Sequence, residues 1–159
     1  MAHSRDSTHK PTVLVVDDTP DNLQLLNAVL KDQYTVKVAN GGERALKLVS
    51  TWPPPDLILL DIMMPEIDGY EVCRRLKSNP FTVDIPVIFV TAMSECEDEQ
   101  KGFELGCADY ITKPISPPIV LARVRTHIRL KHALESLKDQ SRLLEAELAR
   151  RGSSRVPSR

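Results

Sequence analysis

Acidic, basic and hydroxyl side chains follow several short apolar runs in this 159-residue sequence. Asp17 and Asp18 follow the first run, Asp61 and Thr91 follow two later ones, and Lys113 follows the last. Carboxylates that crowd together repel one another unless a hard cation such as Mg²⁺ and a nearby ammonium offset their charge. If the chain brings these five side chains together, they suggest a magnesium site in which Lys113 supplies the ammonium.

The elements that must position these side chains are short β-rich runs separated by helical patterns. The first, third and fourth runs are nearly continuously apolar, which is typical of parallel strands covered on both faces. The carboxyl ends of such strands converge on one crevice, so the chemistry-bearing residues become neighbours. We therefore expect an α/β fold with a doubly wound, five-stranded parallel sheet and helices on both faces. The expected strands are Thr12–Val16, Thr35–Ala39, Leu57–Leu60, Val87–Val90 and Tyr110–Ile111.

Capping residues and prolines mark the expected helix ends. Thr19 and Ser116 each precede a proline, and Ser94 forms a capping box with Glu97. These three hydroxyl residues are therefore predicted N-caps. A second helix is predicted over residues 42–51, where three prolines end it, and a third over residues 68–77.

The last helix, which begins near Pro117, continues well beyond the length that a compact domain needs. Its apolar positions then follow heptad spacing, which predicts a coiled coil and a parallel homodimer. Leu130, Leu137 and Leu144 take the d positions, and His127, Leu134, Ser141 and Leu148 take the a positions. The predicted organisation is a flexible segment at 1–10, a domain at 11–131, a coiled-coil extension at 132–149 and a disordered tail at 150–159.

Composition excludes several classes of protein. Twenty-one basic against 22 acidic residues give a net charge of −1, which provides no field for binding nucleic acid. The apolar runs are too short to cross a membrane, and residues 1–10 lack a secretory signal, so we expect a cytoplasmic protein. The cysteines and histidines lack metal-ligand spacing and are expected to pack or to lie at the surface. They are Cys73, Cys96, Cys107, His3, His9, His127 and His132.

Four sequence motifs together resemble the receiver domain of two-component response regulators. They are Val13 to Asp18, Leu57 to Pro65 followed by Asp68-Gly69, Val90-Thr91-Ala92, and Gly106 to Pro114. The resemblance covers residues 11–131. It implies a domain that takes a phosphoryl group from a histidine kinase or phosphotransfer protein and switches conformation or dimerisation to control an output. The sheet order 2-1-3-4-5 and an extended carboxyl-terminal helix follow from the same resemblance and pattern.

The resemblance also assigns roles to individual residues. Asp61 is the expected phosphoacceptor, and Mg²⁺ is the expected cofactor. Asp18, Asp61 and the carbonyl of Met63 are expected to bind the metal directly, and Asp17 largely through water. Thr91 and Lys113 are expected to bind the phosphoryl oxygens, Tyr110 to be the switch aromatic with Thr91, and Pro114 to follow a cis peptide bond. An output domain is expected to follow this chain or to act as a separate partner.

Two other interpretations compete with this one. A pseudo-receiver that binds proteins without phosphorylation has the same fold, but it does not need all of Asp17, Asp18, Asp61, Thr91 and Lys113. A phosphatase of the haloacid dehalogenase type needs a second aspartate two residues after the nucleophile, where this chain has Met63. The sequence therefore favours a phosphoacceptor signalling domain, which at most catalyses its own phosphorylation and dephosphorylation, over an enzyme.

Overall fold

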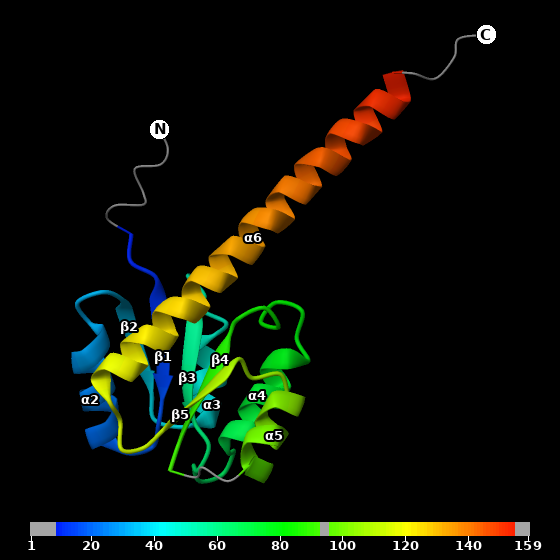
Figure 1. Cartoon of the computed structure of the whole chain (residues 1–159). Helices are drawn as coiled ribbons and strands as arrows, with labels where there is room; N and C mark the ends of the chain where they lie inside the picture. The colour runs from blue at the N-terminus through cyan, green and yellow to red at the C-terminus, as the bar shows by residue number, and fades with distance from the viewer. Residues whose placement is uncertain (1–8, 93–95, 155–159) are drawn as a thin grey trace.

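The computed structural model of the chain describes residues 9–92 and 96–154. Strands and helices alternate along it (Figure 1). In chain order they are β1 (Thr12–Val16), α2 (Pro20–Leu30), β2 (Thr35–Ala39), α3 (Gly42–Leu48), β3 (Leu57–Asp61), α4 (Gly69–Lys77), β4 (Val87–Thr91), α5 (Cys96–Glu104), β5 (Asp109–Thr112) and α6 (Pro117–Ser154).

The five strands form one parallel sheet in the order β2-β1-β3-β4-β5, which confirms the predicted fold class. Every residue of β1, β3 and β4 is buried, whereas the edge strand β2 is mostly accessible. Central parallel strands lie between two layers of helices, so an apolar side chain is favoured at every position. This explains why these three strands are the clearest in the sequence.

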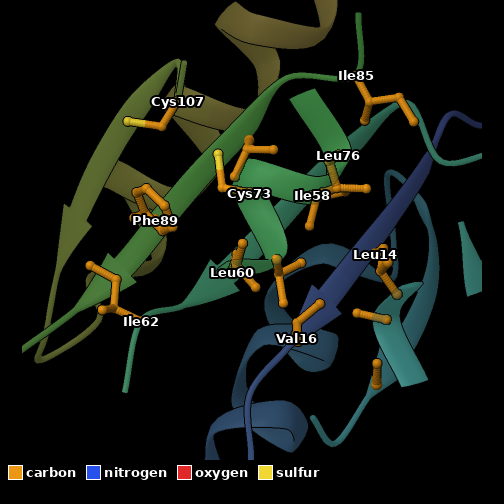
Figure 2. Packing of buried hydrophobic residues seen from close by; sticks show 14 of the residues in the cluster. Leu14, Val16, Ile58, Leu60, Ile62, Cys73, Leu76, Ile85, Phe89 and Cys107 are labelled. Carbon is orange, nitrogen blue, oxygen red and sulfur yellow. The ribbon is translucent and has the colours of Figure 1, made fainter. Parts of the chain in front are cut away.

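Two apolar layers hold the helices against the sheet. On one face, Leu26 and Leu30 of α2 pack with Val120, Val124 and Ile128 of α6. On the other face, α3 and α4 cover side chains such as Leu14, Ile58 and Phe89, and Figure 2 shows residues of this layer between the sheet and α4. The sheet is thereby a rigid support that brings the carboxyl ends of the strands to one edge.

Local helix ends depart from the predictions at two places. The second predicted helix, α3, ends at Leu48 rather than at Thr51, because the Thr51 hydroxyl donates to the Leu48 carbonyl at 2.7 Å in a tight turn. Thr19 occupies the N-cap of α2, but its side chain makes no capping hydrogen bond. Asp68 does cap α4, accepting from the backbone N–H of Glu71 at 2.9 Å. The predicted Ser94 cap lies outside the described residues.

The helix α6 has 38 residues and leaves the body of the molecule after Ile128 (Figure 1). It corrects the predicted boundary at residue 149, because the helix continues to Ser154 through part of the expected tail. Arg150 and Arg151 both pair with Glu147 one turn earlier, which supports helix in an Arg-rich segment. Within the described residues, neither α6 nor any other helix is long and apolar enough to cross a membrane.

Candidate functional site

Three carboxylates meet at the edge of the sheet where the strands end. Asp17 and Asp18 follow β1, and Asp61 is the last residue of β3. One oxygen from each of the three lies within 4.8 Å of the others, close enough to share one metal ion. Asp17 and Asp61 are buried, whereas Asp18 is exposed. The site therefore has a buried floor and one accessible carboxylate at its rim.

The start of α2 fixes the orientation of Asp17. Its Oδ1 accepts from the Thr19 backbone N–H at 2.9 Å, and its Oδ2 accepts from Asn22 Nδ2 at 3.2 Å. Hydrogen bonds to both oxygens keep this carboxylate facing its neighbours. Asn22 is a site residue that the sequence analysis missed. Its position in the first turn after Pro20 is the signal that could have drawn attention to it.

Lys113 lies between two of the carboxylates. Its Nζ is 3.4 Å from Asp17 Oδ2 and 3.4 Å from Asp61 Oδ1, although 96 and 52 residues separate the partners in sequence. The peptide bond between Lys113 and Pro114 is cis. Three carboxylates and one ammonium leave a net charge of minus two (−3 + 1) when all are ionised. This donor set fits a hard divalent cation such as Mg²⁺, whose preferred ligands are oxygens.

Asp61 is the most electrostatically perturbed carboxyl group of the cluster. Burial, the Asp17 charge and, more weakly, Asp18 raise its pKa to about 6, and the adjacent Lys113 opposes this rise. Burial and neighbouring like charges disfavour the ionised form of a carboxylate. A cation bound beside it would stabilise that form. Strongly perturbed groups of this kind cluster at functional sites.

Backbone contacts align the remaining predicted residues with this cluster. Thr91, the last residue of β4, is completely buried, and its carbonyl accepts from the Lys113 backbone N–H at 2.8 Å. Met63 lies on the exposed loop after β3. That loop returns tightly, because the Gly69 N–H donates to the Ile62 carbonyl, and a Cβ at Gly69 would lie only 2.3 Å from the Asp61 carbonyl. A glycine is therefore required where α4 begins.

Tyr110 lies on β5, beside the end of the sheet that carries the site. The structure holds its ring inside the molecule, with 7% of its surface exposed, against Phe89 and Phe103. The switch aromatic expected from the resemblance is therefore already turned inward in the unphosphorylated chain. Its movement on phosphorylation stays a prediction.

Two histidines and two cysteines lie elsewhere. His127 and His132 of α6 contact Asp109 and Asp56, respectively. Cys73 and Cys107 are free, buried thiols of the core, and burial raises the pKa of Cys107 to about 12. These placements agree with packing and surface roles.

The family of response regulator receiver domains matches residues 13–125, which include every residue of the site described above. The chain belongs to this family. Receiver domains are signalling modules of two-component systems. The order of the strands is that of a receiver, and the resemblance inferred from the motifs is confirmed.

Curated relatives of this receiver are much longer proteins. The "Probable cyclic di-GMP phosphodiesterase" of Vibrio cholerae is 46% identical over 148 residues, which are 93% of this chain and 33% of that protein. "Response regulator PleD" of Caulobacter vibrioides is 43% identical over 129 residues, which are 80% of this chain and 28% of that protein. The chain thus spans about a third or less of the length of these relatives.

Solved structures show the same fold. The chemotaxis protein CheY4 of Vibrio cholerae aligns with a TM-score of 0.70 and 26% identity, over 74% of this chain and 98% of that one. The response regulator DrrB of Thermotoga maritima aligns with a TM-score of 0.69 and 34% identity, over 77% of this chain and 54% of that one. Both comparisons leave roughly a quarter of this chain unaligned.

Proposed function

We propose that this receiver accepts a phosphoryl group on Asp61 from a histidine kinase or phosphotransfer protein, and that the change controls an output through α6. The observation that carries the proposal is the position of Lys113 Nζ, 3.4 Å from both Asp17 and Asp61, within a cluster of three carboxylates. A nucleophilic carboxylate, a cation site and an ammonium are the parts that phosphoryl transfer requires.

In the proposed reaction, a carboxylate oxygen of Asp61 forms a bond to phosphorus while the bond from phosphorus to the donor's histidine nitrogen breaks. The electron pair of that bond returns to the imidazole. Lys113 and the Thr91 hydroxyl hold the transferred oxygens, and Asp17 with Asn22 keeps the floor of the site in place. Asp18, Asp61 and the Met63 carbonyl would hold Mg²⁺ directly, and Asp17 would hold it through water, so that the cation would offset the charge of the incoming phosphoryl group.

Treatment with acetyl phosphate tests the proposal. Intact mass spectrometry should show one added phosphoryl group that requires Mg²⁺, and Asp61→Asn should lose it completely. Asp68→Asn is the matched control, because Asp68 caps α4 outside the cluster and asparagine is also a good N-cap. Equal labelling of Asp61→Asn would refute the assignment, and an unlabelled parent protein would favour a phosphorylation-independent pseudo-receiver.

The exposed leucines of α6 support a homodimer as the second part of the proposal. The predicted seam residues Leu130, Leu134, Leu137, Leu144 and Leu148 are between 52% and 64% exposed in the single chain. A stripe of this length is costly in water, and it has the spacing of a two-stranded coiled coil. A second α6 packed along it would bury these side chains.

The body of the receiver leaves this seam open. Lys131 pairs with Asp56 at 3.5 Å, and Lys138 pairs with Asp84 at 3.1 Å, so this side of α6 faces the body. Both lysines are e positions of the predicted heptad, next to the leucine seam rather than on it. Ion pairs with the body therefore hold α6 in an orientation in which a partner helix can approach the seam.

Sedimentation tests the dimer. Leu134→Glu combined with Leu137→Glu should convert a dimer to a monomer that still accepts phosphate on Asp61. Leu143→Glu is the control, because Leu143 is exposed but lies off the seam, and it should leave the dimer intact. A parent protein that is monomeric at tens of micromolar with and without acetyl phosphate would contradict the coiled coil.

We further propose that the controlled output acts on cyclic di-GMP. The Vibrio cholerae relative is named a probable cyclic di-GMP phosphodiesterase, and its similarity extends over 93% of this chain and hence into α6. A chimera in which residues 9–154 replace the receiver part of that relative tests the proposal. Acetyl phosphate should change its hydrolysis of cyclic di-GMP, and an Asp61→Asn chimera should not respond. An equal response of both would reject it.

A further inference from the structure

The ring of Tyr110 lies in a pocket made by aromatic side chains from two other elements. Its centroid is 5.6 Å from that of Phe89 on β4 and 5.4 Å from that of Phe103 on α5. Aromatic pairs at this spacing contribute stability beyond the area that they bury. Phe89 is completely buried, so this pocket is continuous with the core of the receiver.

The pocket is deep enough for tyrosine only because residue 102 has no side chain. A Cβ added to Gly102 would lie 2.0 Å from the Tyr110 hydroxyl oxygen and 2.8 Å from the ring carbon that carries it. It would also come within 3.0 Å of Phe89. Gly102 lies within α5, where alanine would otherwise favour the helix, so glycine here has a cost that a close contact can explain.

Tyr70 of α4 also contacts the residues of this pocket. Its hydroxyl is hydrogen-bonded to that of Tyr110, whose hydroxyl also bonds to the backbone of Gly102. The Tyr70 ring packs edge-on to Phe89 at 5.5 Å, and Lys101 Nζ lies over its face at 4.4 Å. The inward Tyr110 thus joins β5 to both α4 and α5.

The same tyrosine forms part of a surface cleft. Tyr70, Lys101 and Leu105 line a cleft of about 580 Å³ between α4 and α5. This cleft lies on the face of the sheet opposite α6, because α4 packs in the other apolar layer. Any movement of Tyr70 therefore changes the wall of the cleft.

We propose that Gly102, Tyr70 and Tyr110 form a two-tyrosine latch, in which the absence of a side chain at residue 102 lets Tyr110 enter and fix Tyr70 at the wall of the α4–α5 cleft. The position of Tyr110 is then transmitted to a second face of the receiver, away from α6. The latch is formed in the folded chain before Asp61 carries a phosphoryl group.

A double-mutant cycle on thermal unfolding tests the close contact. In the parent protein, Gly102→Ala should lower the unfolding midpoint, because the Cβ expels Tyr110 from its pocket. In a Tyr110→Leu background, which lacks the hydroxyl and the outer ring carbon, the same change should raise the midpoint by about 3 °C through helix propensity. An equal shift in both backgrounds would overturn the proposal.

Chemical acetylation with N-acetylimidazole, read by peptide mass spectrometry, tests where the hydroxyl lies. Tyr110 should react faster in Gly102→Ala than in Gly41→Ala, a control site with open space around its Cβ position. Tyr70→Phe removes one hydroxyl bond and should raise the reactivity of Tyr110 about fivefold. Tyr34→Phe, on the other face of the sheet, should leave it unchanged. Equal protection in all four variants would refute the latch.

These measurements use protein that has not been phosphorylated. If Asp61 failed to accept a phosphoryl group, the proposed function would fall while the cycle and the acetylation rates still reported on the latch. Conversely, suppose that Asp61 is phosphorylated but Tyr110 reacts equally slowly with N-acetylimidazole in every variant. That result would reject the latch and leave the proposed function standing.

Discussion

The body of the receiver and the outer part of α6 are built on opposite principles. Asp17, Asp61 and Thr91 of the site are buried beneath a sheet edge that five strands define, whereas the leucines of α6 beyond Ile128 are mostly more than half exposed. Contacts in the body come from several elements at once. Contacts of the outer α6 come from single ion pairs, such as Lys138 with Asp84.

This difference distinguishes the body, which keeps the site residues in place, from the outer part of α6, which can exchange one contact surface for another. A densely packed interior transmits small displacements and resists others, so the site keeps its geometry. A helix held by exposed ion pairs can exchange them at little cost, since each contributes at most about 1 kcal/mol. We therefore expect substitutions in the body to act on stability and those in the outer α6 to act on assembly.

The largest predicted effect is in the body. Phe89→Ala should lower the free energy of unfolding by about 3–5 kcal/mol, because it leaves a cavity between Tyr70 and Tyr110. Leu144→Ala, measured by urea denaturation of monomeric protein, should change it by less than about 0.5 kcal/mol. Similar costs for the two substitutions would remove the distinction between body and outer helix.

Asp61→Asn should stabilise the metal-free body. The pKa of Asp61 is raised from 3.8 to about 6, so folding favours the neutral form of this group. Its contribution to the free energy of unfolding is therefore fully present below pH 3.8 and is lost as the pH rises to about 6. In EDTA at pH 7 the variant should be about 2–3 kcal/mol more stable than the parent. Denaturation at several pH values checks this, and a parallel pH dependence of both proteins would contradict it.

Asp109, where the body meets α6, should change the stability with pH in the opposite direction to Asp61. Although burial opposes it, hydrogen bonds with His127 and the Tyr110 N–H, together with Arg123, hold the pKa of Asp109 below its usual value. Its stabilisation is therefore present above the usual carboxyl pKa and is lost as pH falls. Asp109→Asn should cost about 1 kcal/mol at pH 7 and less in acid. A cost that grows in acid would refute this sign.

The smallest effect is expected in the outermost contact between α6 and the body. Asp84→Asn breaks the exposed pair with Lys138 and should change the free energy of unfolding by less than about 0.5 kcal/mol. High salt should abolish even this difference, because exposed charges are screened. A loss above 1 kcal/mol that persists in salt would show that the helix is anchored as firmly as the body.

Much of the fold was predictable because its strands are continuous apolar runs. The run Leu57 to Leu60 is typical of a central parallel strand, and the topology then brings Asp17, Asp61 and Lys113 to one edge. The sequence analysis therefore found the carboxylate cluster. Its metal ligation and phosphoryl chemistry stay predictions.

Contacts that depend on docking angles were not predictable. Arg123 and His127 reach Asp109 only because of the angles at which α6 crosses the sheet. No spacing rule specifies those angles. The extension of α6 beyond residue 149 was missed for a different reason, because Arg-rich composition indicates disorder unless local pairs such as Glu147 with Arg150 support a helix.

The length of α6 makes it a lever arm. From Ile119 to Arg151 it contains no proline or glycine, so nothing in its sequence introduces a kink. The 26 residues that follow Ile128 in α6 extend about 39 Å at 1.5 Å per residue. A tilt of roughly 5° at the base would displace the tip by about 3 Å, which is about the rise of two residues along a helix. Shifts too small to disturb the core are thus magnified at the far end.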